Sequence, residues 1–393
     1  MHINRLIPFA LCLLLSLPST LRTEGVTRAI EPTDVKSIKV LMHKDKDSIL
    51  FEAKGPFSVF DPNKGRKVGS GRYGKRFRMV LHEEGIKWGE HFLGIFQLRI
   101  VPEKPGTTFL INGVQVRGAV AVYHVENKLA IVNEVDMEHF LKSTLPARLP
   151  ADNLLPEEVL DAVAIVARTD AYHTAVKGQD LFYHVDAEVA GYTGCGLTLR
   201  EPRIERAIDD TRRLIMTFEG RSFPATWTEH SGGKTAPYAR IFGKDVATPP
   251  GVTSVFSARG RALTRWNYSI STEKLAELMR LNRITGIDPF VDSSSRKTYA
   301  LRIRDGVHPK DIDFLSLRAL LGNDALRSND FTVRLQEDHI LFEGYGRGTG
   351  TGLCLYGASE MAERGDDAPA ILSTFFPKAR IEKIFCRGDV EEP

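Results

Sequence analysis

Apolar and polar residues alternate in short runs along the chain after a polar stretch that ends near Lys36. Alternation with a period of two places the apolar side chains on one face of a β-strand. Gly, Pro and Asn residues between the runs are typical of turns. The pattern therefore predicts a β-rich N-terminal lobe of antiparallel strands at Ile38-Val40-Met42, Ile49-Phe51, Phe57-Val59, Phe77-Met79-Leu81, Phe96-Leu98-Ile100, Phe109-Ile111, Val120-Val122 and Leu129-Ile131.

The clearest helix extends from Pro156 to Val176, because Pro lies near its first turn and Gly178 follows its end. Apolar residues cover most of its surface, which is typical of a helix in a core. Arg168, Thr169 and Asp170 are unusual polar residues on such a helix. A buried arginine needs partners, so Arg168 either forms an ion pair that ties the helix to a neighbouring strand or contacts a ligand.

Helices and strands follow one another in mixed order in the C-terminal half. Amphipathic patterns predict helices at Glu273–Leu281 and Asp311–Leu321, and a last helix at Tyr356–Arg364. Strands are expected at Tyr299-Leu301-Ile303 and Phe331-Val333-Leu335. Because no regular βαβ alternation is present, we expect an α+β fold.

The composition narrows the class of ligand. The 393 residues include 53 basic and 50 acidic side chains, which gives a formal net charge of +3 with interspersed signs. This distribution lacks the basic footprint of a nucleic-acid-binding protein, so we expect no nucleic-acid partner. A hydrophobic content of 42% excludes general disorder, and a neutral or weakly charged polymer fits best as ligand.

The N-terminus resembles a targeting segment. Arg5 precedes the apolar run Leu6–Leu17, which predicts a signal peptide or an uncleaved N-terminal anchor within residues 1–25. We therefore expect the protein to be secreted or periplasmic, or anchored outside the cytoplasmic membrane. Cys195, Cys354 and Cys386 remain beyond this segment, and they form either three free thiols or one disulfide with one free thiol. No cysteine or histidine cluster predicts a metal site, and no cofactor is expected.

Two glycine-containing segments resemble nucleotide motifs but fail the spacing test. Thr228–Thr235 ends like a phosphate loop, yet Thr228 occupies the place of the first required glycine. The glycines at every second position from Gly344 to Gly352 fit no dinucleotide-binding pattern. Such a run provides backbone without side chains on one face, so it forms either a ligand-facing loop or a tightly packed strand crossing.

Glu229, His230 and Ser231 are adjacent reactive residues beside a Gly-Gly turn. On a strand, Glu229 and Ser231 share one face and His230 points to the other. This arrangement weakens a Ser-His dyad and favours a carboxylate with a neighbouring hydroxyl, unless the segment is simply a polar turn.

Five segments in order resemble the SpoIID/LytB family, the stage II sporulation protein D group of secreted peptidoglycan-remodelling proteins. The resemblance implies a SpoIID-like mixed α/β catalytic-type domain at residues 115–380, after a β-rich lobe at 36–114 and before a C-terminal tail at 381–393. The divergence is similar to that of chlamydial members. The five segments are Val116–Leu141, Leu155–Tyr172, Ala225–Thr235, Leu315–Val333 and Gly344–Gly365.

The resemblance implies a lytic transglycosylase that cleaves glycan strands. In that chemistry one glutamic acid protonates the glycosidic oxygen and then, as a carboxylate, removes a proton from a sugar hydroxyl. The family places this acid in a turn before the Ala-rich helix, and the matching position here is Arg148. A guanidinium cannot act as a general acid near neutral pH.

Other positions of the family pattern also differ. Thr349 stands for a histidine, Cys354 for a serine and Leu355 for a glutamine. Thr228 and Glu229 stand for a His-Ser pair. The resemblance therefore supports the scaffold more strongly than the chemistry.

Two hypotheses follow from the resemblance. In the first, Glu229 replaces the lost acid and the protein cleaves peptidoglycan glycan strands, which contact Arg148, Arg168, Trp227, Thr228, His230, Ser231, Thr349 and Tyr356. In the second, the protein is a non-catalytic module that binds peptidoglycan and enhances a cell-wall amidase or assists a divisome protein. Both require that the turn before the Ala-rich helix, the Trp-Thr-Glu-His segment and the glycine run border one groove. A structural protein without glycan affinity is the third alternative.

Overall fold

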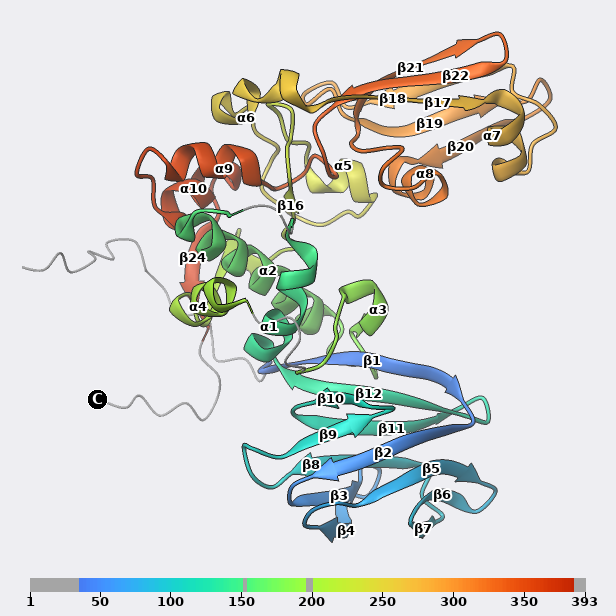
Figure 1. Cartoon of the computed structure of the whole chain (residues 1–393), viewed down its shortest axis with the longest axis vertical. Helices are drawn as coiled ribbons and strands as arrows, with labels where there is room; N and C mark the ends of the chain where they lie inside the picture. Colours follow the sequence, from blue (N-terminus) through green and yellow to red (C-terminus); the bar gives the residue numbers. More distant parts are fainter. Residues whose placement is uncertain (1–34, 151–153, 196–200, 385–393) are drawn as a thin grey trace, which may run out of the picture.

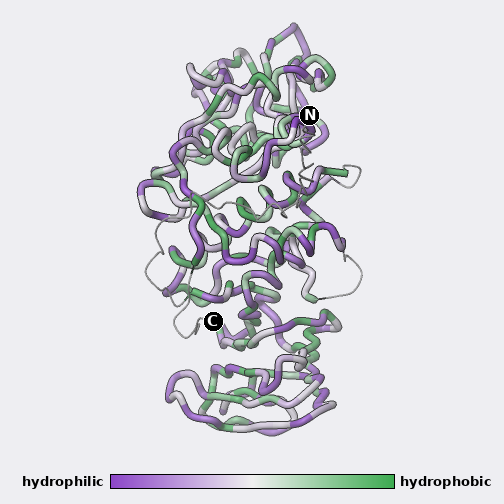
Figure 2. The backbone as a smooth tube through the Cα atoms, turned by 90° about the vertical axis from the view of Figure 1, so that its left-hand side faces the viewer, coloured by the Kyte–Doolittle hydropathy of each residue, from purple (hydrophilic) through white to green (hydrophobic). Residues whose placement is uncertain are grey.

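The computed structural model describes residues 35–150, 154–195 and 201–384. The expected signal peptide or anchor and Cys386 lie outside these residues. The described chain forms an N-terminal lobe of strands, a middle layer of helices and an inserted lobe of strands and helices, stacked along the long axis (Figure 1). Figure 2 shows the same stacking from the side, with apolar segments running through the helices of the middle layer. The α+β class is thus confirmed.

Two sheets build the N-terminal lobe. The strand orders are β13-β1-β12-β11-β8-β3-β4 and β10-β9-β2-β5-β6-β7. An aromatic cluster fills the space between the sheets, where the rings of Phe51 and Trp88 meet edge to face at 5.0 Å between centroids. The strands are β1 (Ser37–Lys46), β2 (Ser48–Lys54), β3 (Phe57–Asp61), β4 (Arg66–Gly71), β5 (Arg76–His82), β6 (Gly85–Trp88), β7 (Glu90–Leu93), β8 (Gln97–Pro102), β9 (Thr108–Ile111), β10 (Val114–Val116), β11 (Ala119–Val125), β12 (Lys128–Asp136) and β13 (Val185–Asp186).

The N-terminal sheets continue past the expected boundary at residue 114. β11 pairs with β8 and with β12, and β12 pairs along its whole length with β1, from Ser37 opposite Asp136. These pairings place strands of the SpoIID-like segment and of the N-terminal lobe in one hydrogen-bonded sheet. The boundary at 114 therefore falls inside the lobe, which extends to Asp136.

The middle layer surrounds the long Ala-rich helix, whose core position is confirmed. Its helices are α1 (Met137–Arg148), α2 (Glu157–Lys177), α3 (Ala187–Ala190), α4 (Pro202–Asp210), α9 (Leu355–Ala362) and α10 (Ala368–Phe375). A small sheet of β14 (Leu214–Phe218), β15 (Arg221–Ser222) and β24 (Arg380–Lys383) lies beside α2. Because β24 pairs with β14, the segment expected as a tail from residue 381 begins inside a strand.

Helix α1 was not predicted. The Asp136 side chain accepts hydrogen bonds from the amides of Glu138 and His139 and so caps the helix start. Pro146 interrupts the hydrogen-bond ladder near the end, which is why the sequence here resembles a turn. Arg148 therefore lies in the last turn of a helix.

The inserted lobe has a hydrophobic core of its own, which includes Phe314, Leu317 and Phe342. Its two sheets have the orders β17-β22-β21 and β18-β19-β20. The helix expected from Asp311 begins at Phe314 instead, because Asp313 caps it by accepting from the Ser316 amide and the preceding residues pair with β19. The elements are α5 (Tyr238–Phe242), α6 (Val255–Arg259), η2 (Arg261–Thr264), β17 (Arg265–Ser271), α7 (Thr272–Met279), β18 (Gly286–Val291), β19 (Thr298–Arg304), β20 (Pro309–Asp313), α8 (Phe314–Leu321), β21 (Asp330–Gln336) and β22 (His339–Tyr345).

The glycine run is a tightly packed crossing of two chain segments. Strand β16 (Trp227–Thr228) pairs in parallel with β23 (Leu353–Cys354), and the glycines before β23 pass over the residues around β16. A Cβ at Gly348 would collide with the Thr228 hydroxyl, and one at Gly352 with the Thr226 carbonyl. Both glycines also have φ values of +109° and +69°, which disfavour other residues. The crossing, and not the ligand-facing loop, is the correct alternative.

Candidate functional site

Three distant segments meet where helix α1 ends. The guanidinium of Arg148 lies over the ring of Trp227, 4.4 Å from its centroid. Trp227 in turn is paired with Leu353 of β23, directly after the glycine run. The end of α1, the Trp-Thr-Glu-His segment and the glycine crossing are therefore neighbours, and the groove that both glycan hypotheses place between them stays a prediction.

Burial alternates along the Trp-Thr-Glu-His segment. Trp227 and Glu229 are half-buried, whereas Thr228 and His230 are buried. The Thr228 hydroxyl donates to the Arg347 carbonyl at 2.8 Å, and His230 accepts from the Gly232 amide at 3.0 Å. Trp227 and Glu229 thus face outward, while Thr228 and His230 hold the segment against the glycine crossing.

Glu229 is engaged by arginine. Its Oε2 lies 3.1 Å from Nε of Arg347. Its charge also acts on Arg318 of α8, raising the pKa of that guanidinium against the larger effect of burial, which lowers it. Glu229 therefore lies where the middle layer meets the inserted lobe, and its carboxylate must leave Arg347 before it could donate a proton.

Asp170 is a second carboxyl group, whose charge interacts with that of Arg148, and it was not among the predicted site residues. It is half-buried on α2, and burial raises its pKa to about 6. The charges of Arg148 and Lys244 and a hydrogen bond from the Ala225 amide all oppose this rise. The charge of Asp170 also reaches Tyr238, whose pKa burial and Asp170 together raise to about 12. The signal in the sequence was an acidic residue on an otherwise apolar helix.

We call Arg148, Asp170, Trp227, Glu229 and Arg347 the Trp227 surface. It combines an aromatic ring, two cations and two carboxyl groups in different environments. Burial favours the neutral form of Asp170 at mildly acidic pH, whereas Glu229 forms an ion pair with Arg347. Two carboxyl groups with such different surroundings are typical of acid-base chemistry.

Arg168 does not reach this surface, which corrects its predicted role in substrate binding. It is completely buried, and its Nη2 lies 2.7 Å from Glu138 Oε2. The same guanidinium donates to the carbonyls of Ile208 and Leu214 at 2.9 and 3.1 Å. Arg168 therefore ties α2 to α1, α4 and β14, as the ion-pair alternative expected.

Ser231 is buried and Tyr356 is half-buried, and each has contacts within the protein. Ser231 is 1% exposed, and its amide donates to Cys354 Sγ at 3.2 Å. Burial raises the pKa of Tyr356, with a smaller effect from Glu360, and its ring lies 4.7 Å from that of His230. These positions favour support of the segment over direct contact with a polymer.

Thr349 remains near the outside of the crossing. It is half-buried, and its hydroxyl lies 3.0 Å from that of Thr351, which is bonded in turn to Thr226 at 2.9 Å. This short row of hydroxyl groups ends at Thr226, the residue that precedes Trp227 in the chain. Thr349 can therefore still contribute to a surface that binds hydroxyl-rich ligands.

The comparisons with known proteins bear on this middle layer. Residues 125–218 match the family model of the stage II sporulation protein, SpoIID. These residues are thus similar to a SpoIID domain. The matched residues include Arg148 and Asp170 and end before Trp227. The SpoIID domain relates the protein to sporulation and the cell wall.

Relatives of the chain occur in two groups of bacteria. A protein of Chlamydia muridarum is 35% identical over 181 residues, which is 46% of this chain and 62% of that protein. One of Chlamydia pneumoniae is 34% identical over 181 residues, 46% of this chain and 65% of its own length. A protein of Brachyspira hyodysenteriae is 25% identical over 345 residues, 86% of this chain and 91% of its own length. All three carry the name "Uncharacterized protein".

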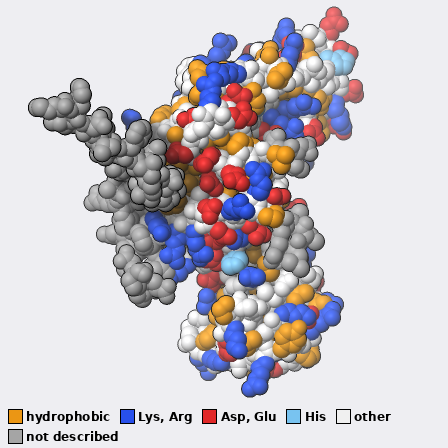
Figure 3. All heavy atoms as spheres, turned by 60° about the vertical axis from the view of Figure 1, so that its left-hand side comes forward, with side chains coloured by type: hydrophobic (Ala, Val, Ile, Leu, Met, Phe, Trp, Pro, Cys, Tyr) orange, Lys and Arg blue, Asp and Glu red, His pale blue; other side chains and the backbone are white. Residues whose placement is uncertain are grey.

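Further features of the described residues concern metal ligands, cysteines, membrane-spanning helices and surface charge. No group of His, Cys, Asp or Glu in the described ranges could hold a metal ion. Cys354 is a buried free thiol. No described helix has both the length and the apolar character needed to cross a membrane. Figure 3 shows acidic and basic side chains intermixed over one face of the middle layer.

Proposed function

We propose that the protein binds peptidoglycan glycan strands at the Trp227 surface and cleaves them. The observation that carries this proposal is the stack of Arg148 on Trp227 beside Asp170, whose pKa burial raises to about 6. The activity belongs outside the cytoplasmic membrane, where such a wall is found, and the SpoIID domain supports a role at the cell wall.

A half-buried indole that faces outward suits a sugar polymer. The faces of a pyranose ring carry C–H groups that pack on an aromatic ring, while its hydroxyl groups need polar partners. Trp227 provides the ring, and the guanidiniums of Arg148 and Arg347 provide N–H donors beside it. The groups present therefore match the two chemical faces of a glycan.

Asp170 is the better general acid of the two carboxyl groups. A general acid must be protonated before the reaction and ionised after it, so its pKa should lie near the working pH. With a pKa of about 6, roughly a tenth of Asp170 is protonated at pH 7 and roughly half at pH 6. In the chemistry that the family resemblance implies, Asp170 would protonate the glycosidic oxygen and then accept the proton of a sugar hydroxyl. Glu229, expected from the sequence as the acid, would instead position Arg347 against the strand.

Two isosteric variants distinguish the proposed roles of Asp170 and Glu229. Purified protein is incubated with peptide-free glycan strands, and mass spectrometry measures anhydro-muramyl and reducing ends. We expect Asp170→Asn to reduce product formation by at least about a hundredfold, because it removes the proton donor. We expect Glu229→Gln to reduce it by less than about tenfold, because it weakens only a positioning contact.

The control for these variants is Asp311→Asn in the inserted lobe, where Asp311 pairs with Arg302 at 2.8 Å. It changes a carboxylate to an amide away from the Trp227 surface and should leave the rate unchanged. Loss of products in Glu229→Gln with retained activity in Asp170→Asn would transfer the acid role to Glu229.

One observation favours a second function. Helix α1 ends in Arg148 where the family resemblance expects an acid, so the surface could retain glycan binding without cleavage. In that case the protein would dock on peptidoglycan and enhance a cell-wall amidase or assist a divisome protein. Incubation of wild-type protein with wall fragments identifies this function. The protein would then sediment with the fragments, and mass spectrometry would detect no new ends.

A further inference from the structure

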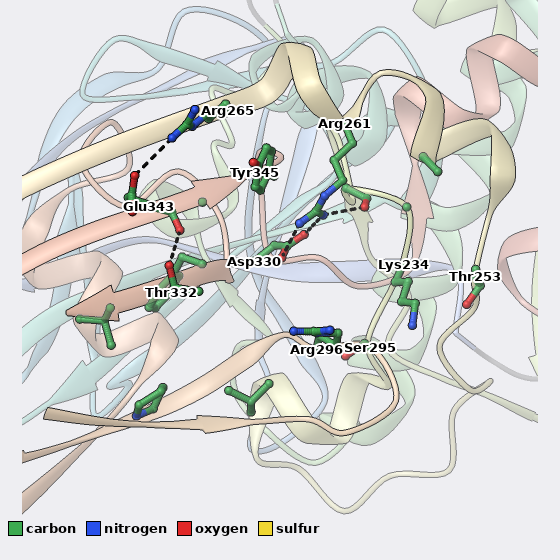
Figure 4. Close-up of a pocket in the computed structure, with 18 residues that line it drawn as sticks. Lys234, Thr253, Arg261, Arg265, Ser295, Arg296, Asp330, Thr332, Glu343 and Tyr345 are labelled. Carbon is green, nitrogen blue, oxygen red and sulfur yellow. Dashed lines mark hydrogen bonds and ion pairs between the residues drawn. The ribbon is translucent and has the colours of Figure 1, made fainter.

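A cavity of about 810 Å³ lies in the inserted lobe, next to the Gly-Gly turn that follows Ser231. Gly232, Gly233 and Lys234 form one wall, and strands β18, β21 and β22 contribute the others. The volume lies in the range that holds a small ligand. Figure 4 shows Arg261 and Asp330 near its centre, Lys234 on one side and Arg265 with Glu343 on the other. The cavity is separate from the Trp227 surface but is built on the same stretch of chain.

Positive charge exceeds negative charge around the cavity. Its two lining carboxylates are each shared between two cations. Asp330 pairs with Arg261 and, at 3.1 Å, with the buried Lys297. Glu343 pairs with Arg265 at 3.3 Å and with Arg334.

Two further cations border the cavity without a carboxylate partner. Lys234 donates only to the Ser294 carbonyl at 3.2 Å, and Arg296 is exposed. Within the described ranges, no ion pair joins an acidic side chain to either residue. The Asp292 carboxylate accepts a hydrogen bond from the Ser295 hydroxyl through one oxygen. Its other oxygen lies 3.7 Å from Nε of Arg240. Lys234 and Arg296 are therefore available to a ligand that carries negative charge.

The cavity also has apolar walls. Pro289 and Val291 of β18 face Phe331 and Val333 of β21 around it. A small inorganic anion would use the cations and leave these side chains without contact. A ligand with methyl or methylene groups beside its charges matches both kinds of wall.

We propose that this cavity binds the carboxylate groups of a short acidic peptide attached to the glycan strand. The inference rests on the proposed function for the identity of the strand. The guanidinium of Arg296 and the ammonium of Lys234 bind the carboxylates, and the apolar side chains contact the aliphatic parts of the peptide. Gly232 in the cavity wall follows Glu229 by three residues, a reach of at most about 11 Å of chain, so the proposal has a strand at Trp227 extend its substituent toward the cavity.

The test compares two ligands of equal size. One is the disaccharide of N-acetylglucosamine and N-acetylmuramic acid carrying L-Ala–D-Glu, and the other is the same compound with both carboxyl groups amidated. Isothermal titration calorimetry with the full-length protein should give a dissociation constant about tenfold or more lower for the acidic form. Raising the salt concentration should reduce this difference.

Two variants locate the effect in the cavity. Arg296→Gln and Lys234→Gln should each weaken binding of the acidic form toward the value of the diamide and leave the diamide unchanged. The matched control is Arg302→Gln, because Arg302 is an arginine of the same lobe paired with Asp311 and absent from the cavity lining. It should leave both constants unchanged.

Three results would overturn the proposal: equal constants for the two ligands, variants that bind the acidic form as well as wild type does, or inorganic phosphate that competes as strongly as the acidic peptide. The last would indicate a simple anion site. None of these results depends on cleavage, so failure here and failure of glycan cleavage by wild-type protein are distinguishable.

Discussion

At the scale of single residues, the site contains two carboxyl groups in different surroundings: Asp170, whose pKa burial raises to about 6, and Glu229, which pairs with Arg347. The period of two separates half-buried Glu229 from buried His230 as predicted, but Ser231, expected on the face of Glu229, is buried too. Asp170 was visible only as a charge on an apolar helix. Its raised pKa arises from burial, which outweighs the lowering effects of Arg148, Lys244 and the Ala225 amide, all distant in sequence. Such an environment is set by the fold and cannot be deduced from spacing.

The pH dependence of cleavage tests this environment. If protonated Asp170 donates the proton, the rate is highest below its pKa and falls as the pH rises through about 6. The charge of Arg148 lowers this pKa, so Arg148→Ala should raise it and move the falling limb of the profile to higher pH. The measurement is kcat/KM against pH for wild type and variant.

Arg302→Ala is the control for this shift, since Arg302 pairs with Asp311 on the inserted lobe. It should leave the profile in place. A limb that stays at the same pH in Arg148→Ala, or moves to lower pH, would contradict the assignment of Asp170.

Whole elements followed from the sequence where the pattern is local and strong. The eight strands predicted for the N-terminal lobe and helix α2 lie where periodicity places them, whereas the short strands β4, β6, β7 and β10 were not predicted. Helix α1 was missed because Pro146 near its end resembles a turn, and the start of α8 was misplaced because Asp313 is a cap and not a helical residue. The glycine crossing could not be predicted either, since its partner segment around Thr228 lies more than a hundred residues earlier.

Alanine at Gly348 tests whether the crossing is packed as described. The new Cβ would collide with Thr228, at a φ of +109°. We expect Gly348→Ala to lower the free energy of unfolding by about 3 kcal/mol or more, measured by urea denaturation, because clash and backbone strain add.

The comparison variant is Gly365→Ala, where φ is +93° but no atom lies within 4 Å of the added Cβ. It isolates the cost of the backbone conformation alone, about 1–2 kcal/mol. Equal losses in the two variants would show that the crossing has room for a side chain.

The whole molecule stacks three parts, and the Trp227 surface lies in the middle layer at its border with the inserted lobe. β16 and β23 belong to this border, and Arg318 of the inserted lobe lies within reach of the Glu229 charge. The sequence predicted the α+β fold, but neither the separate core of the inserted lobe nor the extension of the first lobe to Asp136. Both depend on pairings between segments far apart in the chain.

The account depends most on whether a glycan binds at Trp227. The direct measurement is the affinity of wild type, Trp227→Ala and Tyr73→Ala for purified peptide-free glycan strands, by co-sedimentation over a range of protein concentrations. Tyr73 is an aromatic residue of the N-terminal lobe that is 73% exposed, so it controls for nonspecific stacking. We predict that Trp227→Ala weakens binding by about tenfold or more while Tyr73→Ala binds like wild type. Undiminished binding by a folded Trp227→Ala variant would contradict the account.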